Sequence, residues 1–167
     1  RGANTTGAEN VAVGSLALDA NTTGSTNTAV GNQALSANNT ASDNVAVGQA
    51  AMANNTTGAA NLAIGRSAMS ANTTGTRNLA IGYQAYTASD TENDNLAIGY
   101  QAMVTNTAGG TKLLAIGNYA LDAATSGDQN VAVGYAALGA TTTGENNTAV
   151  GVDALLTNST GSNNTGL

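Results

Sequence analysis

Hydrophobic and polar positions follow one pattern along this chain, and the pattern returns with a period of 17. An Ala-(Val/Ile)-Gly tripeptide ends at nine glycines, and every interval between them equals this period except for one interval of 18. These glycines are Gly14, Gly31, Gly48, Gly65, Gly82, Gly99, Gly117, Gly134 and Gly151. The extra residue falls near Gly109 and Gly110. Self-similarity at a fixed period indicates a repeat architecture, so the chain is predicted to be a stack of similar units.

Other positions of the unit also keep their residue type. Alanine stands three positions after each glycine, and a large residue such as Leu18, Met52 or Tyr86 follows it. Asparagine stands four positions before the glycine, except at Leu113, which lies beside the insertion. This asparagine column contains Asn10, Asn27, Asn44, Asn61, Asn78, Asn95, Asn130 and Asn147. The repeat unit is therefore N-(V/T/L)-A-(V/I)-G-x-x-A-(L/M)-x-A-N-T-T-G-x-x.

The segment before each glycine is predicted to be a short β-strand. Val11–Val13 and Leu62–Ile64 have β-branched or large apolar residues at alternate positions, and a glycine ends each segment. A unit of this length is too short for a pair of helices, and its Asn-Thr-Thr-Gly sequence favours a turn. The stretch between the glycine and this turn fits either a second strand or a tight helical turn. We expect a strand there.

Stacking the units pairs equivalent strands in parallel, with a rise of about 4.8 Å per coil. The predicted fold class is therefore all-β. It is a parallel β-solenoid of about nine to ten coils that covers residues 1–167 as one segment, truncated within a repeat at both ends. Stacked asparagine side chains form hydrogen bonds along such a column. The column glycine suits a corner with a positive φ angle.

The predicted strand has no polar face. A strand that is apolar on both sides is usually covered on both sides. We therefore expect the side chains on one face of each strand to pack in the core of their own coil. We expect the other face to pack against partner chains, with the strands near the axis of a parallel homotrimer.

Composition narrows the possible functions. The chain has no His, Cys, Trp, Phe or Pro, only 8% of its residues are charged, and its net charge is −6. Without His and Cys it lacks the usual general base and thiol nucleophile, so no catalytic residue and no cofactor are expected. The scattered Arg and Lys residues do not line a nucleic acid, and no apolar run is long enough to span a membrane. Low aromatic content is typical of disorder, but disordered chains lack a strict period.

The charged residues give two local hypotheses. Asp90, Glu92 and Asp94 lie in one turn, where alternate carboxylates suit Ca²⁺, but the loop lacks the six or more convergent oxygens that calcium takes. We therefore prefer a solvated turn and keep these acids as a weak metal candidate. Arg77, Asp94 and Lys112 each stand five positions before a glycine. In-register stacking predicts that Asp94 lies within salt-bridge reach of Arg77, Lys112 or both.

Three columns of uncharged residues are the remaining candidates for functional sites. Tyr83, Tyr100 and Tyr135 share the position after the glycine, where stacking along the rod is the preferred interpretation and contact with sugars or another surface is the alternative. Sequons recur in or beside the turns, and we interpret most of them as the Asn-Thr-Thr turn of the repeat. They lie at Asn4, Asn21, Asn38, Asn55, Asn72, Asn146, Asn158 and Asn163. Because the same turns form regular Thr columns, the alternative function is an ice-binding solenoid that uses Asn and Thr ladders.

The repeat resembles two groups of surface proteins. Its N-(V/L)-A-(V/I)-G pattern is similar to the N-S-V-A-I-G-x-x-S repeats of YadA-like head domains in trimeric autotransporter adhesins. Its N-T-A-V-G and A-L-x-x-N-T-T-G segments are similar to the repeat region of phage tail fibres and of large bacterial surface proteins with a C-terminal self-cleaving chaperone. The resemblance covers essentially the whole chain. This sequence differs in its longer period, in having Ala where the adhesins often have Ser, and in an Asn one residue closer to the glycine.

The resemblance implies a left-handed parallel β-roll with three chains to a head, displayed outside the cell or on a virion. It also implies binding to a host, matrix or glycan surface, and it brings no catalytic residues in this region. We therefore expect a non-catalytic structural or adhesive segment of an extracellular fibre, either a trimeric adhesin head or stalk or a phage tail fibre.

Overall fold

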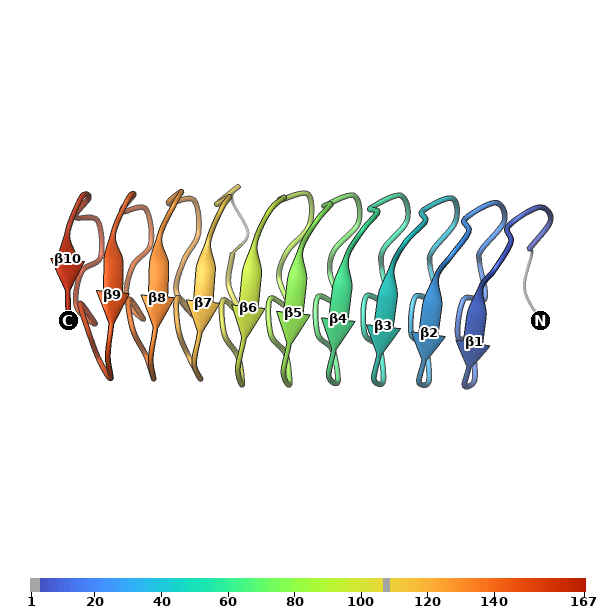
Figure 1. The fold of residues 1–167 in the computed structure, drawn as a ribbon, viewed down its shortest axis with the longest axis horizontal. Coiled ribbons are helices and arrows are strands. Elements are labelled where there is room, and N and C mark those ends of the chain that lie inside the picture. Colours follow the sequence, from blue (N-terminus) through green and yellow to red (C-terminus); the bar gives the residue numbers. More distant parts are fainter. Residues whose placement is uncertain (1–3, 107–108) are drawn as a thin grey trace.

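The computed structural model describes residues 4–106 and 109–167. Its ten β-strands form one parallel sheet, in which each strand pairs with the strand of the next coil in sequence order (Figure 1). The strands are β1 (Val11–Val13), β2 (Thr28–Val30), β3 (Val45–Val47), β4 (Leu62–Ile64), β5 (Leu79–Ile81), β6 (Leu96–Ile98), β7 (Leu114–Ile116), β8 (Val131–Val133), β9 (Thr148–Val150) and β10 (Thr165–Gly166). The chain is a parallel β-solenoid, which confirms the predicted fold class.

The strand register follows the sequence repeat. Ala12 of β1 lies opposite Ala29 of β2, and the equivalent pairing continues along the sheet. β6 and β7 keep this register although the coil that joins them contains the extra residue. That residue is absorbed in the turn after Asn106, whose side-chain amide donates to the carbonyl of Gly110, four residues further on. The equivalent bond in a regular coil spans three residues.

The core consists of three columns of apolar side chains. The central alanine of each of the strands β1 to β9 points inward, and Ala29 and Ala46 are fully buried. The alanine three positions after the glycine and the large residue that follows it supply the other two columns, as the fully buried Ala34 and Leu35 show. Two of the three columns are thus alanine, so the two sides of each coil lie close together.

The stretch after each glycine is a turn, and the expectation of a second strand there was wrong. Leu16 and Leu18 have φ angles of 59° and 51°, and the equivalent residues of the other coils have similar values. A strand needs a negative φ at every residue. The chain instead turns twice, and the backbone amides of Ala17 and Asn21 donate to the carbonyls of Gly14 and Leu18. Because residues other than glycine rarely adopt positive φ angles, the side chains gave no sign of these turns.

The glycine at the end of each strand has the positive φ angle that the sequence predicted. At Gly48 this angle is 133°. The structure adds a second requirement, because a Cβ on Gly48 would lie 2.5 Å from the carbonyl oxygen of Gly65 in the next coil. Both the backbone conformation and the close approach of the neighbouring coil therefore require glycine.

Candidate functional site: an apolar sheet face and a tyrosine flank

The predicted asparagine column, called here the first asparagine column, holds successive coils in register. At Asn44, the side-chain Oδ1 accepts the backbone N–H of Asn61 at 2.9 Å, and Nδ2 donates to the carbonyl of Gly58 at 2.8 Å. Equivalent bonds recur at other members of the column. Each asparagine side chain therefore connects the turn of its own coil to the next coil, mainly through hydrogen bonds to backbone groups.

A second asparagine column lies in the turn and was missed as a structural element in the sequence. Asn55 is fully buried, and its Nδ2 donates to Oδ1 of Asn38 at 3.0 Å and to the carbonyl of Gly58 at 2.9 Å. Its own Oδ1 accepts Nδ2 of Asn72 at 2.7 Å. The signal in the sequence was the recurrent Asn of the Asn-Thr-Thr-Gly turn. Four sequon asparagines lie buried in this column, namely Asn21, Asn38, Asn55 and Asn72, so their amides are inaccessible in the folded chain.

The second asparagine column is interrupted in three coils, where Ser89, Ala124 and Thr141 occupy its positions. In the regular coils the next asparagine donates to Oδ1 of the one before it. Within the described part of the chain, the buried Oδ1 atoms of Asn72 and Asn106 have no hydrogen-bond partner. Their missing donors are the asparagines that Ser89 and Ala124 replace.

Tyr86 occupies the core position that Leu or Met fills in the other coils, and it is fully buried. Its hydroxyl oxygen accepts Nδ2 of Asn95 at 2.6 Å and Nδ2 of Asn106 at 3.3 Å, so it joins the two asparagine columns. Burial raises the pKa of the Tyr86 phenol well above its usual value. Ser89, in the same coil, is smaller than the Asn of the regular unit, and this compensates for the larger core side chain.

The three acids of the weak metal candidate have separate partners. Asp90 accepts a hydrogen bond from the hydroxyl of Thr73. Glu92 is buried, and its carboxylate accepts the backbone N–H of Asp90 at 2.8 Å. Asp94 belongs to an ion pair with the preceding coil. Among residues 4–106 and 109–167, no three potential metal ligands gather.

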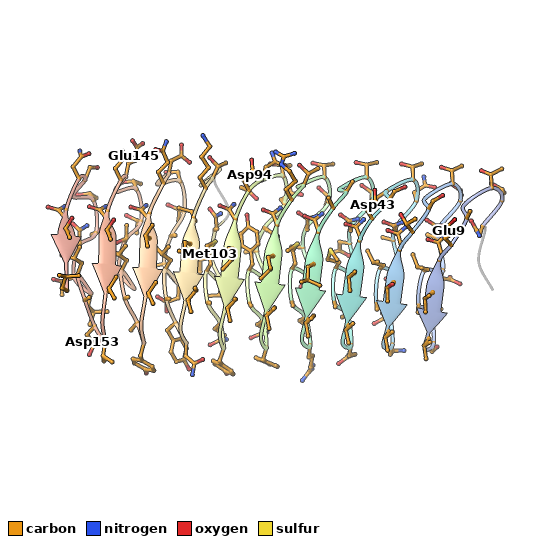
Figure 2. All side chains as sticks on the ribbon, viewed as in Figure 1. Glu9, Asp43, Asp94, Met103, Glu145 and Asp153 are labelled. Carbon is orange, nitrogen blue, oxygen red and sulfur yellow. The ribbon has the colours of Figure 1, made fainter. Side chains whose placement is uncertain are left out.

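The predicted charge column is present, and one of its two contacts forms. Figure 2 shows Glu9, Asp43 and Asp94, which share this column, along one edge of the rod. Nε and Nη2 of Arg77 lie 2.6 and 2.9 Å from the two carboxylate oxygens of Asp94. The hydrogen bond from Arg77 holds the pKa of Asp94 below its usual value. Lys112 forms no ion pair within the described residues and acts on Asp94 only through its charge.

The outward face of the sheet is apolar and uncovered in the single chain. The residues on both sides of the strand alanine point away from the core. They are partly exposed in most interior strands, with Ile64 at 38%, and Val11 and Val13 of the terminal strand β1 are 50% and 58% exposed. This apolar sheet face, which lies toward the viewer in Figure 2, carries Leu and Ile in β4 to β7 and Val or Thr in β1 to β3, β8 and β9. Contiguous apolar surface of this kind marks an interaction site in soluble proteins.

Four tyrosines form a continuous row, called here the tyrosine flank, on Tyr83, Tyr100, Tyr119 and Tyr135. The rings of Tyr83 and Tyr100 stack at 5.2 Å between centroids, as the shared column predicted. Tyr119 packs edge-on to Tyr100 at 5.5 Å and to Tyr135 at 5.7 Å. It was missed in the sequence because it lies one position later, after Asn118. Asp153, which shares the column of Tyr119, marks this edge of the rod, opposite the charge column (Figure 2).

In the turns that contain two threonines, the two hydroxyls are used differently. The first donates to a carbonyl of the next coil, as from Thr22 to Asn39 at 3.1 Å and from Thr56 to Thr73 at 3.0 Å. The second is exposed and lies in a single row that contains Thr23, Thr40, Thr57, Thr74 and Thr91. The turns therefore present one row of exposed threonines, with the asparagines of the same turns buried.

The fold and these surfaces define an all-β protein of the parallel β-solenoid class. Comparisons with family models, with curated proteins and with solved structures give no match. The described part of the chain contains no helix that is able to cross a lipid bilayer. Inferences about function therefore rest on the residues and on the geometry of the apolar sheet face and the tyrosine flank.

Proposed function

We propose that this chain is a non-catalytic structural segment of an extracellular fibre, in which copies pack in parallel through the apolar sheet face. The observation that carries the proposal is the uncovered row of Val, Leu and Ile along successive strands. Burying apolar surface is the main favourable term in protein association. The regular unit supplies the length of the fibre, and its paired asparagine columns supply the rigidity.

A second copy of the same chain is the partner that fits this face best. The apolar pattern has the period of the rod itself, so a parallel copy meets equivalent residues in every coil. Three copies around one axis close the assembly and leave no apolar face outside it. The left-handed winding, the trimer, and the place in an adhesin head or stalk or in a phage tail fibre follow from the resemblance of the repeat. They are part of the same proposal.

The oligomeric state tests the proposal. Light scattering coupled to size exclusion is expected to give the mass of three chains for the unaltered protein. Ile81→Lys on the sheet face is expected to yield monomers, because a charge buried in an apolar interface without a partner is costly. Thr74→Lys adds the same charge at an exposed turn and is the matched control. A stable monomer of the unaltered protein at high concentration, folded by circular dichroism, would show that the proposal is wrong.

Ice binding is the second candidate function, and the exposed threonine row is the observation that favours it. The surface available for ice binding is narrower than the sequence indicated. The hydroxyls of the first threonines are hydrogen-bonded and the turn asparagines are buried, so only the row of second threonines is exposed. A thermal-hysteresis measurement distinguishes the two functions. A fibre segment gives no hysteresis at micromolar protein, whereas hysteresis that Thr57→Lys abolishes would favour the ice-binding function.

A further inference from the structure

We propose that the tyrosine flank binds a neutral glycan chain that lies along the rod axis. The inference deepens the proposed function by naming a partner class. It rests on the display of the rod outside the cell, but not on the assembly of three chains. Four features of the flank support it: the fold does not require its tyrosines, its rings form a continuous row, neutral amides lie beside its rings, and its length is limited.

The solenoid does not need aromatic residues at these positions. Ser15, Asn32 and Gln49 occupy the position after the glycine in earlier coils. The strand register there is the same as in the coils of Tyr83 and Tyr100. The tyrosines lie outside the buried core, and Tyr83, Tyr100 and Tyr135 are 36%, 42% and 50% exposed. Their apolar rings therefore face a partner outside the coil.

The row of rings is continuous across four coils although the column itself is broken. Asn118 stands where the next tyrosine belongs, and Tyr119 supplies the ring instead. Ring centroids follow one another at 5.2, 5.5 and 5.7 Å, which is comparable to the length of one sugar unit. Tyr119 is turned by 70° from the plane of Tyr100, so the row offers both ring edges and ring planes. Hydroxyl groups on these rings donate and accept hydrogen bonds.

Neutral amides lie beside Tyr83 and Tyr100, and charged side chains lie toward the ends of the flank, where Asp122 acts on Tyr119 through its charge and Asp153 lies in the coil that follows Tyr135. Gln84 and Gln101, each next to a flank tyrosine, are hydrogen-bonded through their side chains at 2.8 Å. Arg66 lies 5.8 Å from the ring centroid of Tyr83 and so occupies one end of the row. Because the chain has a net charge of −6, it repels polyanions. Aromatic rings beside amides match the C–H faces and hydroxyls of neutral sugars.

The limited length of the flank distinguishes this surface from the proposed contact between copies. The apolar sheet face runs along all nine complete strands, whereas the tyrosines occur on four successive coils only. A partner that contacts only part of the rod accounts for tyrosines on four coils, whereas a contact along the whole sheet face does not require them. A polysaccharide of several units has the extended shape and the length to follow such a row.

Binding to neutral oligosaccharides tests the inference. The full chain is first applied to an array that holds neutral and acidic glycans, including cellohexaose, xylohexaose, mannohexaose and chitohexaose. Affinity for the best neutral ligand is then measured by calorimetry and by tyrosine fluorescence, to which the four flank tyrosines and the buried Tyr86 contribute because the chain has no Trp. We expect saturable binding to at least one neutral hexasaccharide.

A combined variant then locates the site. Tyr83→Ser, Tyr100→Asn and Tyr135→Gln introduce the residue types that earlier coils have at this position, so the fold is retained. We expect its dissociation constant to rise by about tenfold or more, as is typical when anchor side chains are removed. Gln49→Ser, in the same column outside the flank, is the control with unchanged affinity. An unchanged affinity in the combined variant, binding to acidic glycans only, or no neutral ligand at all would overturn the inference.

The same samples separate this inference from the proposed function. The mass of the combined variant in solution is expected to equal that of the unaltered protein, because the sheet face is intact. Trimers that bind no neutral glycan would overturn the inference and leave the proposed function standing. Monomers that bind a neutral glycan through the flank would overturn the proposed assembly and leave the inference standing.

Discussion

Replacing Asn55 with Asp tests whether the second asparagine column holds the coils together. The side-chain Nδ2 of Asn55 donates to Oδ1 of Asn38 at 3.0 Å and to the carbonyl of Gly58 at 2.9 Å, and the residue is fully buried. Asn55→Asp keeps the shape of the side chain and its bond from Asn72. It removes both donors, however, and turns a carboxylate oxygen toward two acceptors.

The expected loss of stability follows from these contacts. The substitution leaves the buried Oδ1 of Asn38 unpaired, which costs about 1–3 kcal/mol, whereas the carbonyl of Gly58 keeps its hydrogen bond from Asn44. An uncompensated buried charge brings the total to about 3–5 kcal/mol at neutral pH. Burial also raises the pKa of the introduced carboxyl in the folded state above its unfolded value of about 3.9. The folded variant therefore favours the protonated carboxyl, so its stability is highest below about pH 4 and falls as the pH rises.

Urea unfolding followed by circular dichroism measures this loss, and amide hydrogen exchange locates it in the coils around β4. Asn54→Asp is the matched control, because Asn54 is exposed and the substitution adds the same charge one residue earlier. Its effect is expected to stay within about 0.5 kcal/mol. If both variants unfold at the same urea concentration, or if Asn55→Asp gains stability as the pH rises, the column does not act as described.

Three further predictions concern the core and its columns. Ala124→Asn is expected to stabilise the protein by at most about 1 kcal/mol in urea unfolding, because it restores a donor to Oδ1 of Asn106 while its own Oδ1 faces Thr141, whose hydroxyl donates to the carbonyl of Asn158; Ala123→Asn, one residue earlier, is expected to bring no such gain. Gly48→Ala is expected to cost about 3 kcal/mol or more, since it adds backbone strain and a clash with the next coil; a thermal midpoint that does not change would contradict the close approach described here. The raised pKa of Tyr86 predicts that this phenol stays protonated in the folded chain at pH values where exposed tyrosines ionise. Stability is therefore expected to fall as the pH rises above about 10, and an ultraviolet titration of Tyr86→Phe should lack only the late-ionising group.

The sequence alone determined the architecture of this protein because identical units must stack on identical units. Each position of the repeat unit recurs in the same surroundings, so its residue type shows what those surroundings require. The parallel register, the first asparagine column, the positive φ angle of the column glycine and the contact of Arg77 with Asp94 were all predictable from this principle.

The tertiary structure decided which face of each strand is inside and how the chain returns after the glycine. Both faces of a Val-Ala-Val strand are apolar, so hydrophobic pattern does not choose between them. Packing chooses alanine, because the opposite side of the coil lies too close for larger side chains there. The path of the chain after the glycine depends on positive φ angles at residues such as Leu16 and Gln33. Neither residue type is typical of this conformation, so the sequence did not predict it. The contact of Tyr119 with its neighbours likewise joins two different columns, and only the fold brings these columns side by side.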